Sequence, residues 1–127
     1  MYSTQAIGAA PDAAIDMSHL DKYTCGDGAL LDEILGLFVE HSAKCVAGLS
    51  VDADDNVWRD GCHGLKGTAR GVGAWALGQK AAEGEGLIGD LPAKREVREK
   101  LLASIRNSAR EAIDYAEMLR VRATAKA

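Results

Sequence analysis

The chain has 127 residues, enough for one domain with a hydrophobic core but too few for two. Its formal net charge of −4 argues against nucleic-acid binding over a large surface, and no apolar run reaches the roughly 18 residues of a membrane span. Aromatic residues make up only 5 % of the chain and prolines number 2, a composition that favours helices over a β-sandwich.

The N-terminal part of the chain predicts a flexible segment and one short helix. Small residues dominate 1–14, which we interpret as flexible. A short helix is expected over 18–25, because Ser18 and Asp21 resemble the capping box that begins a helix. Three apolar side chains are expected to point inward from it, namely Met17, Leu20 and Tyr23.

A second, longer helix is expected over 28–50, with Asp27 as its N-cap. Its apolar residues recur with the period of about 3.6 residues that marks an α-helix. They are Leu31, Ile34, Leu35, Phe38, Cys45, Val46 and Leu49. The loop that follows contains Asp52, Asp54 and Asp55, whose charges suit the positive end of the next helix.

The third helix carries a narrow apolar seam. Its members are spaced alternately by four and three residues, as in antiparallel bundles, and are Trp58, Cys62, Leu65, Ala69 and Val72. Gly71 and Gly73 are expected to end this helix. A fourth helix is expected over 74–89, and a last one over 92–121 with Pro92 in its first turn. The pattern predicts an all-α protein, an antiparallel up-down-up-down four-helix bundle with a short additional N-terminal helix.

His63 lies on the third helix but outside its apolar seam. At about 100° per residue, the helical wheel places three cations in the same sector as His63, facing away from the core: Arg59, Lys66 and Arg70. Beyond them lie Gly64, Gly67 and Gly71. Glycine inside a helix costs about 1 kcal/mol relative to alanine. On an exposed face it therefore suggests that the backbone of another molecule comes close.

These residue types suit phosphoryl transfer through a covalent intermediate on histidine. A neutral imidazole is a nucleophile near neutral pH. Lys66 and Arg70, one and two turns from His63, can balance the charge of an incoming phosphoryl group. The second ring nitrogen needs an acceptor that fixes its tautomer, and Glu85 on the fourth helix is the candidate. Each of these three charged side chains could instead be an ordinary solvated group.

The pattern is similar to that of the histidine-containing phosphotransfer (HPt) domains of bacterial two-component phosphorelays. The residues that carry the resemblance are His63-Gly64-Leu65-Lys66-Gly67 and Val72-Gly73-Ala74, with Leu77 and Glu85 downstream. Upstream it continues through Ile15-Asp16, Leu20, Gly26-Asp27, Leu31 and Phe38. It covers 15–90 in detail and assigns 15–122 to one HPt domain. Gly64 departs from the family, in which a larger polar residue is common at this position.

The resemblance implies a monomer that carries a phosphoryl group on His63 between aspartates on the receiver domains of a hybrid histidine kinase and of a response regulator. Lys66 would help to neutralise the phosphoryl group, Gly67 would leave room for the receiver, and Glu85 would contact the imidazole. The partner-binding residues would be Arg59, Gly64, Arg70 and Gly71. Mg²⁺ is expected only on the receiver, so this phosphohistidine carrier would need no metal or cofactor of its own and would have no kinase or ATP-binding activity.

Two further expectations concern the surroundings of the chain and an alternative function. The spacing of Cys25, Cys45 and Cys62 suggests neither disulfides nor a zinc module, and 1–14 lacks a signal-peptide pattern, so we expect a cytoplasmic protein with reduced thiols. His19 and His41 lack the set of neighbours found beside His63, in which two cations and a glycine share one helical side, and are expected to be ordinary histidines. The alternative is a non-catalytic adaptor with the same fold that binds a receiver through the same face, and dimerisation is a third possibility.

Overall fold

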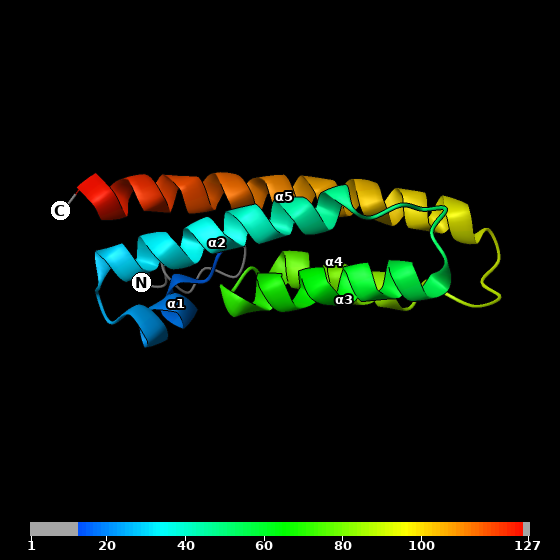
Figure 1. The fold of residues 1–127 in the computed structure, drawn as a ribbon, viewed down its shortest axis with the longest axis horizontal. Helices are drawn as coiled ribbons and strands as arrows, with labels where there is room; N and C mark the ends of the chain where they lie inside the picture. Colours follow the sequence, from blue (N-terminus) through cyan, green and yellow to red (C-terminus); the bar gives the residue numbers. More distant parts are fainter. Residues whose placement is uncertain (1–12, 126–127) are drawn as a thin grey trace, which may run out of the picture.

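A computed structural model describes residues 13–125, whose regular secondary structure is entirely helical (Figure 1). The helices are α1 (Met17–Thr24), α2 (Gly28–Ala47), α3 (Asp55–Gly71), α4 (Trp75–Glu85) and α5 (Lys94–Ala125). This content confirms the prediction of an all-α protein and is compatible with a helical bundle. The predicted flexible segment 1–14 lies outside the described residues except for its last two, and α5 continues past the predicted domain end at 122. None of the described helices combines the length and the apolar composition needed to cross a membrane.

The core lies between two pairs of helices. α3 packs mainly on α4 and α2 packs mainly on α5, and the pairs are joined by contacts of α2 with α3 and of α4 with α5. In Figure 1, α2 and α5 run side by side above α3 and α4, and α1 lies at one end. The predicted seam is buried throughout, with Trp58, Cys62, Leu65, Ala69 and Val72 at most 4 % exposed. It forms one core with buried residues of the other helices, among them Leu35, Phe38, Leu77, Ala81, Ile105 and Ala109.

The start of α1 differs from the prediction. Asp16 is the N-cap, because its Oδ1 accepts hydrogen bonds from the backbone N–H groups of Ser18 and His19 at 3.0 and 3.4 Å. The Ser18 hydroxyl, followed by the Trp75 indole N–H, lowers the pKa of Asp16 by hydrogen bonding to its carboxylate. Tyr23 is 60 % exposed and does not point inward. The buried side chains of this short helix are Leu20 and Thr24.

The other helix boundaries agree with the prediction in part. Asp27 caps α2 through its side chain as predicted, but α2 ends at Ala47, before the expected end at 50. α4 is shorter than expected at its C-terminus, because it ends at Glu85. Pro92 is not in the first turn of α5. The reason is that Ala93, which follows it, adopts a left-handed conformation with φ +52° and so separates it from the helix.

Asp16 also fixes α1 to the turn between α3 and α4. Its backbone N–H donates to the carbonyl of Gly73 at 2.9 Å, and its Oδ2 accepts from Trp75 Nε1 at 3.0 Å. Gly73 has φ +81°, and a Cβ added there would lie 3.0 Å from the Cβ of Asp16. The turn therefore needs glycine both for its backbone conformation and for its close approach to Asp16.

A buried arginine joins the loops at the other end of α3. Arg98 of α5 is only 2 % exposed, and its guanidinium lies 4.8 Å from the ring centroid of Trp58. It donates hydrogen bonds to the carbonyls of Leu87, Val51 and Ala53 at 3.0, 3.2 and 2.8 Å, and to Asp55 Oδ1 at 2.7 Å. The segment after α4, the loop before α3 and the first residue of α3 are thus held by one side chain. The sequence pattern did not indicate this role.

Replacing Arg98 with methionine is expected to lower the free energy of unfolding by about 3 kcal/mol, because partly buried carbonyls lose a donor and the Asp55 carboxylate loses one of its charged partners. Urea denaturation followed by circular dichroism measures the loss. Arg106→Met is the matched control, since Arg106 lies on the same helix with an exposed side chain. Equal stability of the two variants would contradict the role given to Arg98.

Candidate functional site

His63 presents its imidazole to solvent from the middle of α3. Its side chain is 70 % exposed, whereas its neighbour Cys62 is fully buried in the seam. Successive residues of a helix differ in direction by about 100°, so burial of the seam forces His63 outward. The exposure that the helical wheel predicted is therefore found in the structure.

Glu85 brings His63 and Lys66 together. One of its carboxylate oxygens, Oε2, lies 2.7 Å from His63 Nδ1, and the other, Oε1, accepts a hydrogen bond from Lys66 Nζ at 2.6 Å. The side chains of Glu85 and Lys66 are only 22 % and 21 % exposed, so both are partly buried beside the exposed histidine. The hydrogen bond from Lys66, followed by that from His63, lowers the pKa of Glu85.

The contact with Glu85 determines which nitrogen of His63 is free to react. An ionised carboxylate only accepts hydrogen bonds, so the proton of a neutral imidazole lies on Nδ1 and is donated to Glu85. The lone pair is then on Nε2, on a ring that is largely open to solvent. The arrangement is that of an oriented nucleophile beside a fixed negative charge, and such a charge stabilises the ring when it becomes cationic.

The glycines of the predicted partner-binding face leave the surface of α3 open. A Cβ added to Gly67 or Gly71 would meet no atom within 4 Å, and one added to Gly64 would meet only Cys45 Sγ, at 3.9 Å. Packing within the described part of the chain therefore does not require glycine at these positions. This differs from Gly61 on the same helix, where an added Cβ would lie 2.8 Å from Leu49 Cδ2.

The two arginines of this face are exposed and lie toward the two ends of α3. Arg59 donates to Asn56 Oδ1 at 3.0 Å, within its own helix. The side chain of Arg70 lies along α4, where a Cβ on Gly78 would be 3.1 Å from Arg70 Cγ. Within residues 13–125 neither arginine is hydrogen-bonded to His63 or Glu85. They add positive charge along the helix but do not belong to the hydrogen-bonded cluster.

Three features of the site were missed at the level of sequence. Glu85 was expected to contact the imidazole, but its shared use by Lys66 was not foreseen. The indole N–H of buried Trp58 donates to the carbonyl of Gly84 at 2.7 Å, next to Glu85 in the chain. A buried tryptophan needs an acceptor, so Trp58 was itself a signal of such a contact. How closely Gly84 approaches Cys62 was not foreseen either. The Cys62 thiol is buried there, and burial, followed by the nearby charge of Glu85, raises its pKa to about 11.

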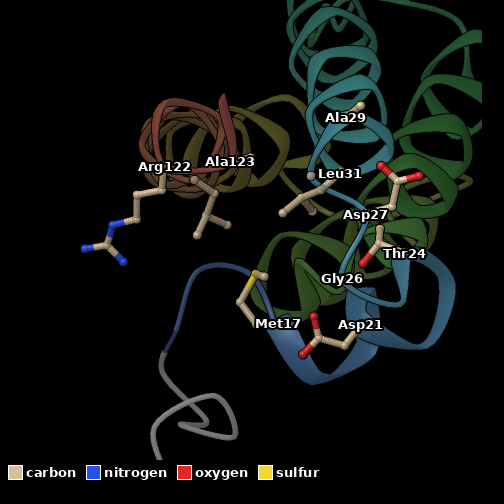
Figure 2. Close-up of a pocket in the computed structure, with 11 residues that line it drawn as sticks. Met17, Asp21, Thr24, Gly26, Asp27, Ala29, Leu31, Arg122 and Ala123 are labelled. Carbon is tan, nitrogen blue, oxygen red and sulfur yellow. The ribbon is translucent and has the colours of Figure 1, made fainter. Parts of the chain in front are cut away.

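The remaining candidate features lie away from this cluster. His19 stacks edge-on against Tyr23 and Trp75, and His41 is exposed on α2. Among residues 13–125, no group of three or more potential metal ligands comes together. A pocket of about 470 Å³ is lined by α1, the start of α2 and the end of α5 (Figure 2). Its lining includes Asp21, Asp27 and Arg122, but no residue of α3 or α4, so it is separate from the site around His63.

The chain was also compared with known proteins. No protein-family model, curated protein or solved structure matches it.

Replacing Lys66 with methionine is expected to raise the pKa of Glu85 toward its ordinary value of 4.5, because the largest cause of its lowering is removed. In the wild type the carboxylate stays ionised as the pH falls through 4.5, so its contacts persist to lower pH than in the variant. An NMR titration of the ¹³C-labelled Glu85 carboxyl measures both values.

Lys80→Met is the control for this titration. Lys80 also lies in a partly buried position, but it donates to Ser104 Oγ and not to Glu85. The interpretation is wrong if the pKa of Glu85 is the same in the two variants.

Proposed function

We propose that this chain is a histidine phosphotransfer protein, which carries a phosphoryl group on His63 between receiver-domain aspartates of a hybrid histidine kinase and a response regulator. The observation that carries the proposal is the pair formed by His63 and Glu85. It holds Nδ1 at 2.7 Å from a carboxylate and leaves Nε2 on a ring that is 70 % exposed. An ordinary surface histidine has no need of a partly buried carboxylate that fixes its tautomer.

The transfer step follows from this geometry. Nε2 attacks the phosphorus of an aspartyl phosphate on the receiver, the Nε2–P bond forms, and the P–O bond to the aspartate breaks so that its carboxylate leaves. The ring becomes cationic with its proton still on Nδ1, and the ionised Glu85 stabilises that charge. The reverse reaction delivers the phosphoryl group to the second receiver. Mg²⁺ belongs to the receiver in this proposal.

Lys66 has a second role in this scheme. In the free chain its ammonium group is bound to Glu85 Oε1 at 2.6 Å, one helical turn from His63. A phosphoryl group on Nε2 brings negative charge to the same face, and Lys66 can then interact with it as well as with Glu85. We assign Lys66 to charge neutralisation and Glu85 to the orientation and stabilisation of the ring.

The open face of α3 is the proposed docking surface for the receiver. Gly64, Gly67 and Gly71 leave it without obstructing side chains, which supports close approach of the receiver backbone. The exposed Arg59 and Arg70 add positive charge on this face of a chain with a net charge of −4. Such local positive charge favours an acidic, phosphoryl-bearing partner.

The finer architecture is part of the same proposal. We propose that α2 to α5 form the antiparallel up-down-up-down four-helix bundle of an HPt domain over 15–122, with α1 as the additional helix. The pairing of α3 with α4 and of α2 with α5 supports this arrangement. We further propose that the protein works as a monomer in the cytoplasm, where receiver domains are found.

His63→Gln is expected to abolish phosphorylation, because glutamine keeps polar character but offers no nucleophilic ring nitrogen. The measurement incubates the protein with phosphorylated receiver domains of the source organism, followed by mass spectrometry at neutral or alkaline pH, since phosphohistidine is lost in acid. His41→Gln, at an exposed histidine of α2, is the control and is expected to accept the phosphoryl group like the wild type. Receiver binding without phosphohistidine in the wild type would favour the adaptor function instead.

Gly67→Met is expected to separate docking from stability. Since a Cβ at this position meets no atom within 4 Å, the variant should fold with unchanged or raised stability, by up to about 1 kcal/mol from helix propensity. Phosphotransfer from the receiver should nevertheless fall by at least about tenfold, because a long side chain then occupies the docking surface. Ala103→Met on the exposed side of α5 is the control. Equal transfer rates for the two variants would remove Gly67 from the docking surface.

A further inference from the structure

Glu85 is placed where a helix is least well held. It is the last residue of α4, which has only 11 residues, and Gly86 follows as the C-cap. The carbonyls of the last helical turn lack partners within the helix, so such ends fray unless other groups bind them. A carboxylate on a fraying end would not hold the His63 ring in one tautomer. The end of α4 therefore needs support from outside α4.

Trp58 supplies a hydrogen bond to the peptide group that precedes Glu85. Its side chain is completely buried, and Nε1 donates to the carbonyl of Gly84 at 2.7 Å. That carbonyl belongs to the peptide unit whose nitrogen is the backbone nitrogen of Glu85, so the bond fixes the direction in which Glu85 leaves the helix. The backbone N–H of Leu87 donates to the same oxygen at 3.0 Å.

Gly84 allows α4 to lie directly against Cys62. A Cβ at position 84 would be 2.6 Å from Cys62 Sγ and 3.4 Å from Cys62 Cβ, a distance at which something must move. Cys62 immediately precedes His63, and Gly84 immediately precedes Glu85. This close approach of the two helices thus lies one residue away from both partners of the His63–Glu85 contact.

Arg98 holds the tryptophan ring and the segment beyond α4. Its guanidinium lies 4.8 Å from the Trp58 ring centroid, and its Nε donates to the carbonyl of Leu87 at 3.0 Å. Trp58 is therefore in contact with Arg98 through its ring face and with Gly84 through its indole edge. The ring has little freedom to turn away from the end of α4.

We propose that Trp58, Cys62 and Gly84 form a positioning unit, the Trp58 clamp, which holds the end of α4 on α3 so that Glu85 keeps the His63 proton on Nδ1. These residues do not touch the reacting atoms. They act through Glu85, and their effect on phosphorylation rests on the proposed function, whereas their effect on the imidazole does not.

The test replaces Trp58 with phenylalanine, which keeps an aromatic ring beside Arg98 but removes the N–H. We expect ¹⁵N NMR of the His63 ring to show a larger fraction of the Nε2–H tautomer than in the wild type. Phosphorylation of His63 by phosphoramidate, in which Nε2 displaces ammonia from phosphorus, should become slower by about two- to tenfold, the factor that corresponds to one hydrogen bond. This probe needs no partner protein.

Trp75→Phe is the matched control. Trp75 is the first residue of α4, the helix that ends at Glu85, and its Nε1 also donates one hydrogen bond, to Asp16 Oδ2 at 3.0 Å. The clamp predicts that W75F leaves the His63 tautomer and the phosphoramidate rate as in the wild type. An equal change in W58F and W75F would indicate a general loss of stability and would overturn the proposal, as would a folded W58F with an unchanged tautomer.

A second set of variants tests the contact between the helices and decides the matter if W58F does not fold. Gly84→Ala should push the end of α4 away from Cys62 and raise the Nε2–H fraction of His63. Combining it with Cys62→Ala removes the sulfur atom and should restore the wild-type tautomer. A folded double variant whose tautomer remains altered would overturn the proposal.

The two readouts separate this inference from the proposed function. A tautomer change confined to the clamp variants, together with a wild-type His63 that no receiver phosphorylates, would leave the clamp in place and reject the phosphotransfer function. The opposite result is a wild type that accepts phosphoryl groups from a receiver, with clamp variants that change neither the tautomer nor the phosphoramidate rate. It would support the phosphotransfer function and reject the clamp.

Discussion

The packing of α4 on α3 decides whether His63 has a carboxylate within reach. The two helices approach so closely at Gly84 and Cys62 that no side chain fits between them. Glu85 lies just beyond this point, and both of its oxygens are used, one by His63 and one by Lys66. A small displacement of α4 would break both contacts, since hydrogen bonds weaken steeply outside a narrow range of distance and angle. The chemistry of an exposed residue thus depends on contacts in the interior.

Helix α3 has two faces with different roles, a buried seam that packs in the core and an exposed face that carries His63. The seam of α3 is buried throughout and determines how the helix is oriented. Its exposed face carries His63 and glycines at which an added Cβ would clash with nothing, so the choice of glycine there is not explained by packing. Arg98 contacts the ring of Trp58, a residue of the buried seam. Trp58 in turn donates to the carbonyl of Gly84, next to Glu85, so Arg98 also supports the exposed site indirectly. Stability and the candidate site are therefore coupled at the N-terminal half of α3 but separable at Gly67.

The α3 seam and the exposure of His63 could be predicted because both follow from helical periodicity, which the sequence states directly. Helix ends were predicted less well. Ala93 adopts a left-handed conformation that separates Pro92 from α5, and Asp16, not Ser18, is the N-cap of α1. Both outcomes depend on local backbone conformations that residue type alone does not fix. The contact of Trp58 with Gly84 joins residues 26 positions apart, so it becomes visible only when the packing is known.

The glycine content of α3 has a consequence for where the candidate site can exist. Gly61, Gly64 and Gly67 all lie in the interior of this 17-residue helix, and each lowers the intrinsic tendency to form a helix by about 1 kcal/mol. Short helices are already marginal in water, so a peptide spanning 55–71 would be largely unstructured on its own. It would contain His63, Lys66 and Gly67 without their shared orientation. Packing of the buried seam keeps α3 helical, so the residues around His63 share one face only in the folded domain.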